Sequence, residues 1–194
     1  MDTTNIILIA LAVIPVLIIG GFLGIVFDRR QRTKRLQKKF GPEYEHILNE
    51  LGDKRQAEHE LSARLDHVDA LDIRPLSEEE VELFTSRWQA TKAEFVDEPL
   101  LSTQKADQLI SEVMRAKGYP LADFEQQAAD ISVDYPDLAT DYRGLHLIAV
   151  KGTQEEVSTE EMRRAMIHGH ALFDKLIKRD ENIIEEAEEK ERVK

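Results

Sequence analysis

Six histidines and several acidic clusters are the side chains of this chain that could bind a metal or take part in catalysis. The closest histidine pair is His168 and His170, but residues two apart on a helix point about 200° away from each other. They could share one ion only if the helix broke there. The sequence has no H-E-x-x-H motif, no E-x-x-H motif with apolar flanks and no cysteine. We therefore expect no metal site and no cofactor.

The densest polar cluster surrounds one proline, and its members are Asp134, Asp137, Asp141, Tyr135 and His146. A catalytic site would need a nucleophile beside a base, or two carboxylates in contrasting environments. A structural interpretation also accounts for the cluster: Asp134 and Pro136 shape a helix start, and Tyr142 and His146 form an i,i+4 pair. The nine glycines form no phosphate-binding loop. We favour the structural interpretation and assign no catalytic residue.

The elements that would position these side chains are helices. Gly41-Pro42 separates two helical segments, and Ser77 with Glu80 and Ser158 with Glu161 have the spacing of capping boxes. Apolar residues recur at spacings of three and four, and no useful length alternates with period two. HLIAV (146–150) is the one candidate strand, and its flanks are helical. The sequence predicts an all-α fold with a bundle of about five to seven helices.

Trp88 is the single tryptophan and lies mid-stripe with Val81, Phe84 and Phe95 on a predicted helix. The charged neighbours Arg87 and Lys92 are expected off that face. Large aromatic side chains in such a stripe usually pack into a core. We expect Trp88 to be buried, and the alternative is an exposed anchor for a protein partner.

Residues 1–27 contain an apolar run, Ile6 to Phe27, with no charged side chain. Its 22 residues would span about 33 Å as a helix, which matches a bilayer core of about 30 Å. A cleaved signal peptide is the alternative, but there is no basic start and no small-residue cleavage site. The sequence predicts an N-terminal transmembrane anchor. Gly20 and Gly24 match a helix-dimer face, although glycine is also common in membrane helices.

Residues 28–40 form a predicted basic juxtamembrane helix. Its basic residues are Arg29, Arg30, Arg32, Lys34, Arg35, Lys38 and Lys39. The positive-inside rule then places the N-terminus outside and the C-terminal domain in the cytoplasm. The same residues could lie at the membrane surface and bind anionic lipid head groups.

The remaining chain divides into an acidic helical domain at 41–179 and a charged C-terminal tail at 180–194. Residues 40–194 carry 19 basic and 36 acidic side chains. Binding to a phosphate backbone depends on Lys and Arg, so nucleic acid is not an expected partner. The tail is interpreted as a solvated helix end, with an acidic docking segment as the alternative.

The order of DIRPLSEEE, FTSRW, ISEVMRAKGYP, DFEQQAADISVDYP and YRGLH resembles that of small bacterial single-pass membrane proteins of unknown function. The resemblance covers most of residues 40–177, and its motifs are helix boundaries and core positions. It implies a bacterial inner-membrane location and supplies no activity. The sequence as a whole favours a membrane-anchored interaction or scaffolding module. An enzyme or a small-ligand sensor built in the helical domain is the alternative.

Overall fold

The computed structural model describes residues 27, 30–120, 122–152 and 157–192, with side chains described as far as residue 178. The chain divides into two compact units, Met1–Lys39 and Phe40–Lys194. Residues 30–39 of the first unit are helical. Residues 6–26 of the predicted anchor lie outside the description, as do Gly20, Gly24 and Arg29. Within the described part, no helix has the length and apolar character needed to cross a membrane.

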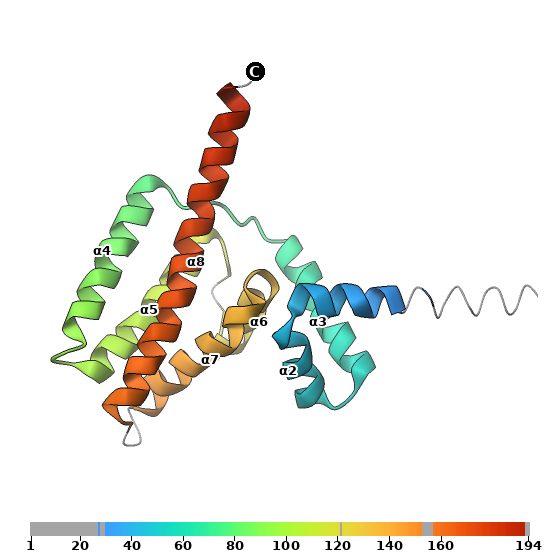
Figure 1. Cartoon of the computed structure of the whole chain (residues 1–194), viewed down its shortest axis with the longest axis horizontal. Helices are drawn as coiled ribbons and strands as arrows, with labels where there is room; N and C mark the ends of the chain where they lie inside the picture. Colours follow the sequence, from blue (N-terminus) through green and yellow to red (C-terminus); the bar gives the residue numbers. More distant parts are fainter. Residues whose placement is uncertain (1–26, 28–29, 121, 153–156, 193–194) are drawn as a thin grey trace, which may run out of the picture. The chain divides into compact units, whose positions relative to one another are not determined.

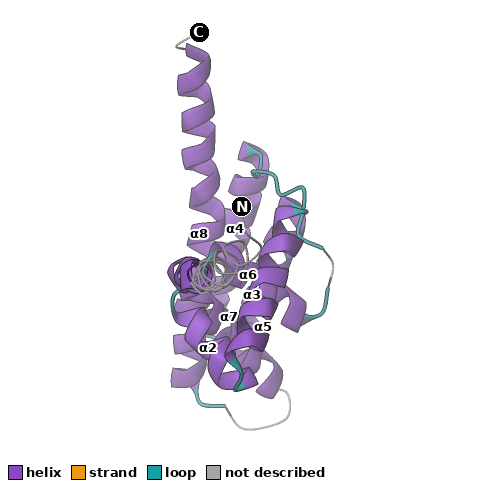
Figure 2. Ribbon diagram, turned by 90° about the vertical axis from the view of Figure 1, so that its right-hand side faces the viewer, coloured by secondary structure: helices purple, strands orange, loops and turns teal. Residues whose placement is uncertain are grey.

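Helices and loops make up the described residues, and no strand occurs among them, so the all-α prediction is confirmed (Figure 2). The second unit contains seven helices within its described residues, drawn in Figure 1. Their bounds are α2 Pro42–Leu51, α3 Lys54–Asp69, α4 Glu78–Glu94, α5 Pro99–Lys117, α6 Phe124–Asp134, α7 Pro136–Lys151 and α8 Thr159–Arg192. The candidate strand 146–150 lies inside α7.

Local capping sets most helix boundaries, as the sequence predicts. The Ser77 hydroxyl accepts from Glu80 N–H, and the Glu80 carboxylate accepts from Ser77 N–H, so α4 begins with a complete capping box. Ser158 and Glu161 make the same reciprocal pair at the start of α8. Proline occupies the first turn of α2, α5 and α7, where its missing N–H costs nothing.

The main core lies among α4 to α8, with α5 packed against α4, α7 and α8. Its fully buried side chains include Leu109, Ile110, Tyr142, Leu145 and Leu172. Each buried aliphatic side chain of this size contributes about 1.5–3 kcal/mol. This core fixes the relative placement of α4 and α8, which line the candidate site.

The α2–α3 pair has its own buried side chains, which do not belong to the main core: Tyr44, Ile47, Ala57, Leu61 and Val68. Tyr44 of α2 donates a hydrogen bond to Glu58 of α3. Burial of the Tyr44 hydroxyl raises the pKa of Tyr44 to about 12. The pair contacts the rest of the unit through α2 on α7 and α3 on α6.

Candidate functional site

Trp88 is the largest side chain between α4 and α8. It is 3% exposed, so the prediction of a buried position is confirmed. Its ring stacks on Phe173 of α8, with centroids 4.6 Å apart, and meets the His170 ring edge-on at 5.4 Å. The indole therefore joins the two helices by aromatic contacts, which are worth about 0.5–1.5 kcal/mol each beyond burial.

Gly169 of α8 makes this close packing feasible. A Cβ atom at this position would lie 2.8 Å from Leu145 Cδ2 and 3.5 Å from Trp88 Cη2. Glycine inside a helix costs about 0.5–1 kcal/mol relative to alanine, so its presence needs a packing reason. The space that Gly169 leaves supplies that reason, and the helical periodicity alone does not reveal it.

An apolar groove of about 370 Å³ lies between α4 and α8 beside Trp88. We call it the Trp88 groove, and its lining residues are Trp88, Lys92, Phe95, Arg163, Met166, Ile167, His170 and Ala171. Ile167 is 54% exposed although its side chain is aliphatic. The expected position of Lys92 off the Trp88 face was wrong, because residues four apart lie on one side of a helix and Lys92 lines this groove.

Trp88 also carries an unmet hydrogen-bond donor. Its Nε1 atom is buried and has no acceptor among the described residues. A buried donor without a partner costs about 1–3 kcal/mol.

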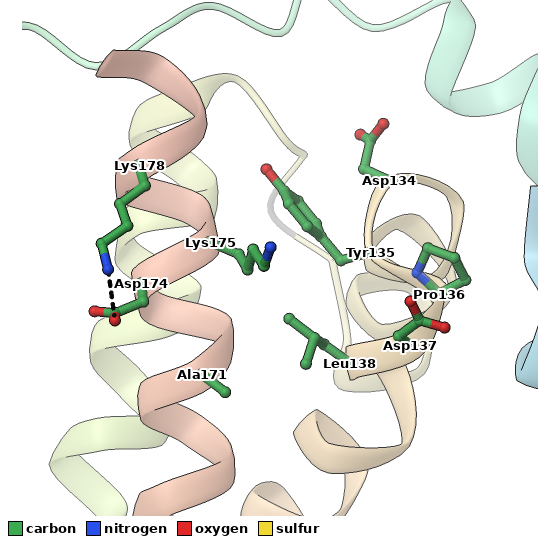
Figure 3. A pocket seen from close by; sticks show the side chains of 9 residues that line it. All are labelled: Asp134, Tyr135, Pro136, Asp137, Leu138, Ala171, Asp174, Lys175 and Lys178. Atoms are coloured by element: carbon green, nitrogen blue, oxygen red, sulfur yellow. Dashed lines mark hydrogen bonds and ion pairs between the residues drawn. The ribbon is translucent and has the colours of Figure 1, made fainter. Parts of the chain in front are cut away.

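A second pocket of about 760 Å³, with several charged side chains in its lining, lies between α8 and the junction of α6 and α7 (Figure 3). Figure 3 shows Lys175 and Lys178 of α8 on one side and Tyr135 to Leu138 on the other. Lys178 pairs with Asp174 at 3.2 Å, and Asp134 accepts a hydrogen bond from Tyr119. Both signs of charge occur in the lining, with Asp174, Lys175 and Lys178 on α8 and with Asp134 and Asp137 on the opposite wall.

The polar cluster predicted around Pro136 does not form one site. Asp134 accepts from Tyr119 Oη at 2.7 Å, Asp141 pairs with His168 at 2.6 Å, and Asp137 lines the pocket of Figure 3. Tyr135, and not Asp134, is the residue that precedes the first turn of α7. The structural interpretation of a helix start at Pro136 is confirmed, with that change of capping residue.

Tyr142 and His146 lie four residues apart on α7, as expected, and Phe124 of α6 contacts both rings. His146 stacks on Phe124 with centroids 3.6 Å apart, and Tyr142 donates to Gln127 Oε1 at 3.1 Å. The partner of His146 is Asp107 of α5, whose Oδ2 atom lies 2.8 Å from His146 Nδ1. The 39-residue separation hid this partner from a local reading of the sequence.

Asp107 and His146 form a dyad in which the carboxylate orients the imidazole. Burial raises the pKa of Asp107, and the hydrogen bond from His146 opposes that rise. A general base also needs room for a substrate beside it. His146 lines neither the Trp88 groove nor the pocket of Figure 3. The dyad therefore packs α5 against α7 and makes no site with either cavity.

His168 and His170 point to different partners, as their spacing predicts. His168 pairs with Asp141 of α7, whereas His170 contacts Trp88 of α4 and lies 3.5 Å from Asp174. Among the described residues, no group of three or more histidine or acidic side chains could hold a metal ion.

A buried ion network centred on Glu43 was not predicted from the sequence. This carboxylate has no exposed surface and accepts two hydrogen bonds from Arg143, at 2.7 and 2.9 Å. Arg64 of α3 donates to Glu43 at 3.0 Å and to Ser132 of α6 at 3.3 Å. The network thus ties α2 and α3 to α6 and α7.

The predicted membrane-surface residues are partly described. Arg30, Arg32, Lys34, Arg35, Lys38 and Lys39 lie on the helical segment 30–39 and have exposed side chains. Exposure leaves these charges accessible to solvent or to an anionic surface.

Comparisons with protein-family models, with curated proteins and with solved structures found no match for this chain.

Proposed function

We propose that this chain is a membrane-anchored interaction module whose helical domain binds a protein partner in the Trp88 groove. The length and apolar composition of residues 6–27 support the anchor. Seven basic residues at 29–39 support a cytoplasmic domain and contact with anionic lipid head groups. The module would thereby hold a partner at the inner face of a bacterial cell membrane.

The observation that carries the proposal is the apolar lining of the Trp88 groove. Two helices supply its walls, and Ile167 exposes 54% of its surface there. An aliphatic and aromatic groove between helices suits the apolar face of an amphipathic helix, which binds through anchors spaced three and four residues apart. The polar side chains of the lining are Lys92, Arg163 and His170, and the two basic ones could pair with acidic residues that flank the apolar face of such a helix.

Site-specific photo-cross-linking in native membranes tests the proposal. A photoreactive amino acid replaces Ile167 in the groove or, as a matched control, Leu147 on α7, which is 51% exposed and lies outside the groove lining. We expect a discrete protein adduct from position 167 and none from position 147. The adduct should weaken when Trp88→Ala is added. Equal labelling at both positions, or none at either, would contradict the proposal.

A further inference from the structure

The C-terminal part of α8 leaves the body of the second unit. Figures 1 and 2 show its last turns extending beyond the other helices of this unit. Backbone helix continues to Arg192, which places about 21 Å of helix after residue 178 at roughly 1.5 Å per residue. The sequence of residues 180–194 contains seven acids and three bases, together with Ile183, Ile184 and Ala187.

The chemistry of this tail complements the Trp88 groove. Lys92 and Arg163 line a groove in a part of the chain that is otherwise strongly acidic. Lys92 has no ion-pair partner among the described residues, and Arg163 pairs only with Glu160 of its own helix, at an exposed position. Exposed pairs of that kind contribute about 0–1 kcal/mol, so an incoming carboxylate can replace Glu160 at little cost.

The groove and the tail of one chain cannot meet, because one wall of the groove and the tail are parts of the same continuous helix, α8. Groove residues of α8 lie between Arg163 and Ala171, and the helix then runs away from them to Arg192. Folding the tail back would break the helix and lose its backbone hydrogen bonds. A tail that fills this groove must therefore come from another molecule.

Extending the proposed function, we propose that the acidic segment 180–194 of a second copy of this chain occupies the Trp88 groove. Ile183 and Ile184 enter the apolar part, and neighbouring glutamates pair with Lys92 and Arg163. Exchange of tails in both directions closes the assembly as a twofold dimer, since each copy offers one groove and one tail. Anchoring both copies in one membrane raises their effective concentration and offsets the repulsion between two acidic domains.

Trp88 makes the proposal directly measurable, because it is the only tryptophan of the chain and lines the groove. The protein used is a truncated chain that ends at residue 178, held in detergent micelles, so that no tail can occupy its groove. A peptide of residues 179–194 is then added to it. We expect the peptide, which has no tryptophan, to change the Trp88 emission saturably. A peptide carrying Ile183→Asp and Ile184→Asp should bind at least about tenfold more weakly.

Two protein variants and a mass measurement complete the test. Ile167→Asp and Lys92→Glu should each weaken peptide binding, and circular dichroism checks that both remain folded. Analytical ultracentrifugation should give a dimer for the full chain and a monomer for the chain ending at residue 178. Full-length chain carrying Ile183→Asp and Ile184→Asp should also be monomeric.

The inference is overturned if the peptide leaves Trp88 emission unchanged, or if the isoleucine substitutions do not weaken its binding. It is equally overturned if removing the tail leaves the mass of the assembly unchanged. Should the peptide fail while a probe at Ile167 still captures a different protein, the proposed interaction module stands and only the self-association fails. Failure of both experiments rejects both proposals.

Discussion

Glu43 shows how much one side chain can contribute to the position of several helices. Its carboxylate lies between Arg64 and Arg143, with no exposed surface of its own. A buried charge is tolerable only when oppositely charged donors satisfy it, and Arg143 does so with two parallel hydrogen bonds. The network therefore specifies the position of α2 and α3 more than it adds net stability.

Replacing Glu43 by glutamine should destabilise the domain by about 3–5 kcal/mol, because two partly buried guanidinium groups lose their common anion. Chemical denaturation of the full chain in micelles, followed by circular dichroism, measures the change. Glu160→Gln is the matched control, since Glu160 also pairs with two arginines, Arg163 and Arg164, but at an exposed position. The control should change stability by less than about 1 kcal/mol. Equal effects would show that Glu43 is not a buried anchor.

Asp130 gives a pH-dependent prediction. Its side chain is buried, one carboxylate oxygen has no partner among the described residues, and burial raises the pKa of Asp130 above its ordinary 3.8 although Gln126 opposes the rise. The folded state thus binds the proton more tightly than the unfolded state, so stability falls as pH rises from about 4 through the folded pKa.

Asp130→Asn removes the ionisation of this buried group and should raise stability at pH 7. At pH 3, where the carboxyl is protonated in both states, the two proteins should differ little. Thermal melts across this pH range test the prediction. If Asp130→Asn is less stable than the original chain at pH 7 but equally stable at pH 3, the pKa of Asp130 is lowered by folding, and the prediction is wrong.

At the scale of elements, two glycines that end helices provide a matched pair. Gly118 after α5 has φ 103° and Gly52 after α2 has φ 65°, and both are conformations that other residues rarely adopt. A Cβ atom on Gly118 would lie 2.4 Å from the carbonyl oxygen of Asp72, whereas nothing lies within 4 Å of one on Gly52. The first site combines backbone strain with a steric clash, and the second has strain alone.

Gly52→Ala should therefore cost about 1–2 kcal/mol, the usual cost of the left-handed conformation. Gly118→Ala should cost clearly more, because the Asp72 backbone must move and the hydrogen bond from Arg74 N–H to the Lys117 carbonyl lies beside it. Paired denaturation curves measure both. Equal losses would show that the Asp72 segment moves away without cost.

Helix positions were predictable from sequence because their signals are local. Ser77 with Glu80 and Ser158 with Glu161 each act within a few residues, and both predictions are confirmed. The partners of His146 and Glu43 were not predictable, because they lie 39 and 100 residues away. Periodicity shows which face of a helix is apolar but not which helix covers that face. The Trp88 groove could not be predicted from the sequence, because it depends on α8 packing beside α4.

For the whole molecule, the acidic domain has two differently built parts. The main core of α4 to α8 is apolar, whereas α2 and α3 join α6 and α7 through the Glu43 network and the approach of His67 to Asp130 at 3.6 Å. Polar interfaces of this kind fix one arrangement, because a shifted register would leave charges buried without partners. The proposed groove lies in the part whose helices share the apolar core.

The charge distribution on either side of residues 6–27 predicts the membrane topology of the chain. Seven basic residues follow the apolar run and none precedes it, so a phosphatase that is active only in the periplasm should stay inactive when fused to the C-terminus. Replacing all seven basic residues with glutamine removes the charge bias and should let part of the population insert the other way, with measurable phosphatase activity. A reporter that is active only in the cytoplasm, fused to the C-terminus, should be active in the original chain and less active in the glutamine variant. This second fusion controls for differences in expression. High phosphatase activity in the original chain would place the helical domain outside the cytoplasm, because the reporter folds only there.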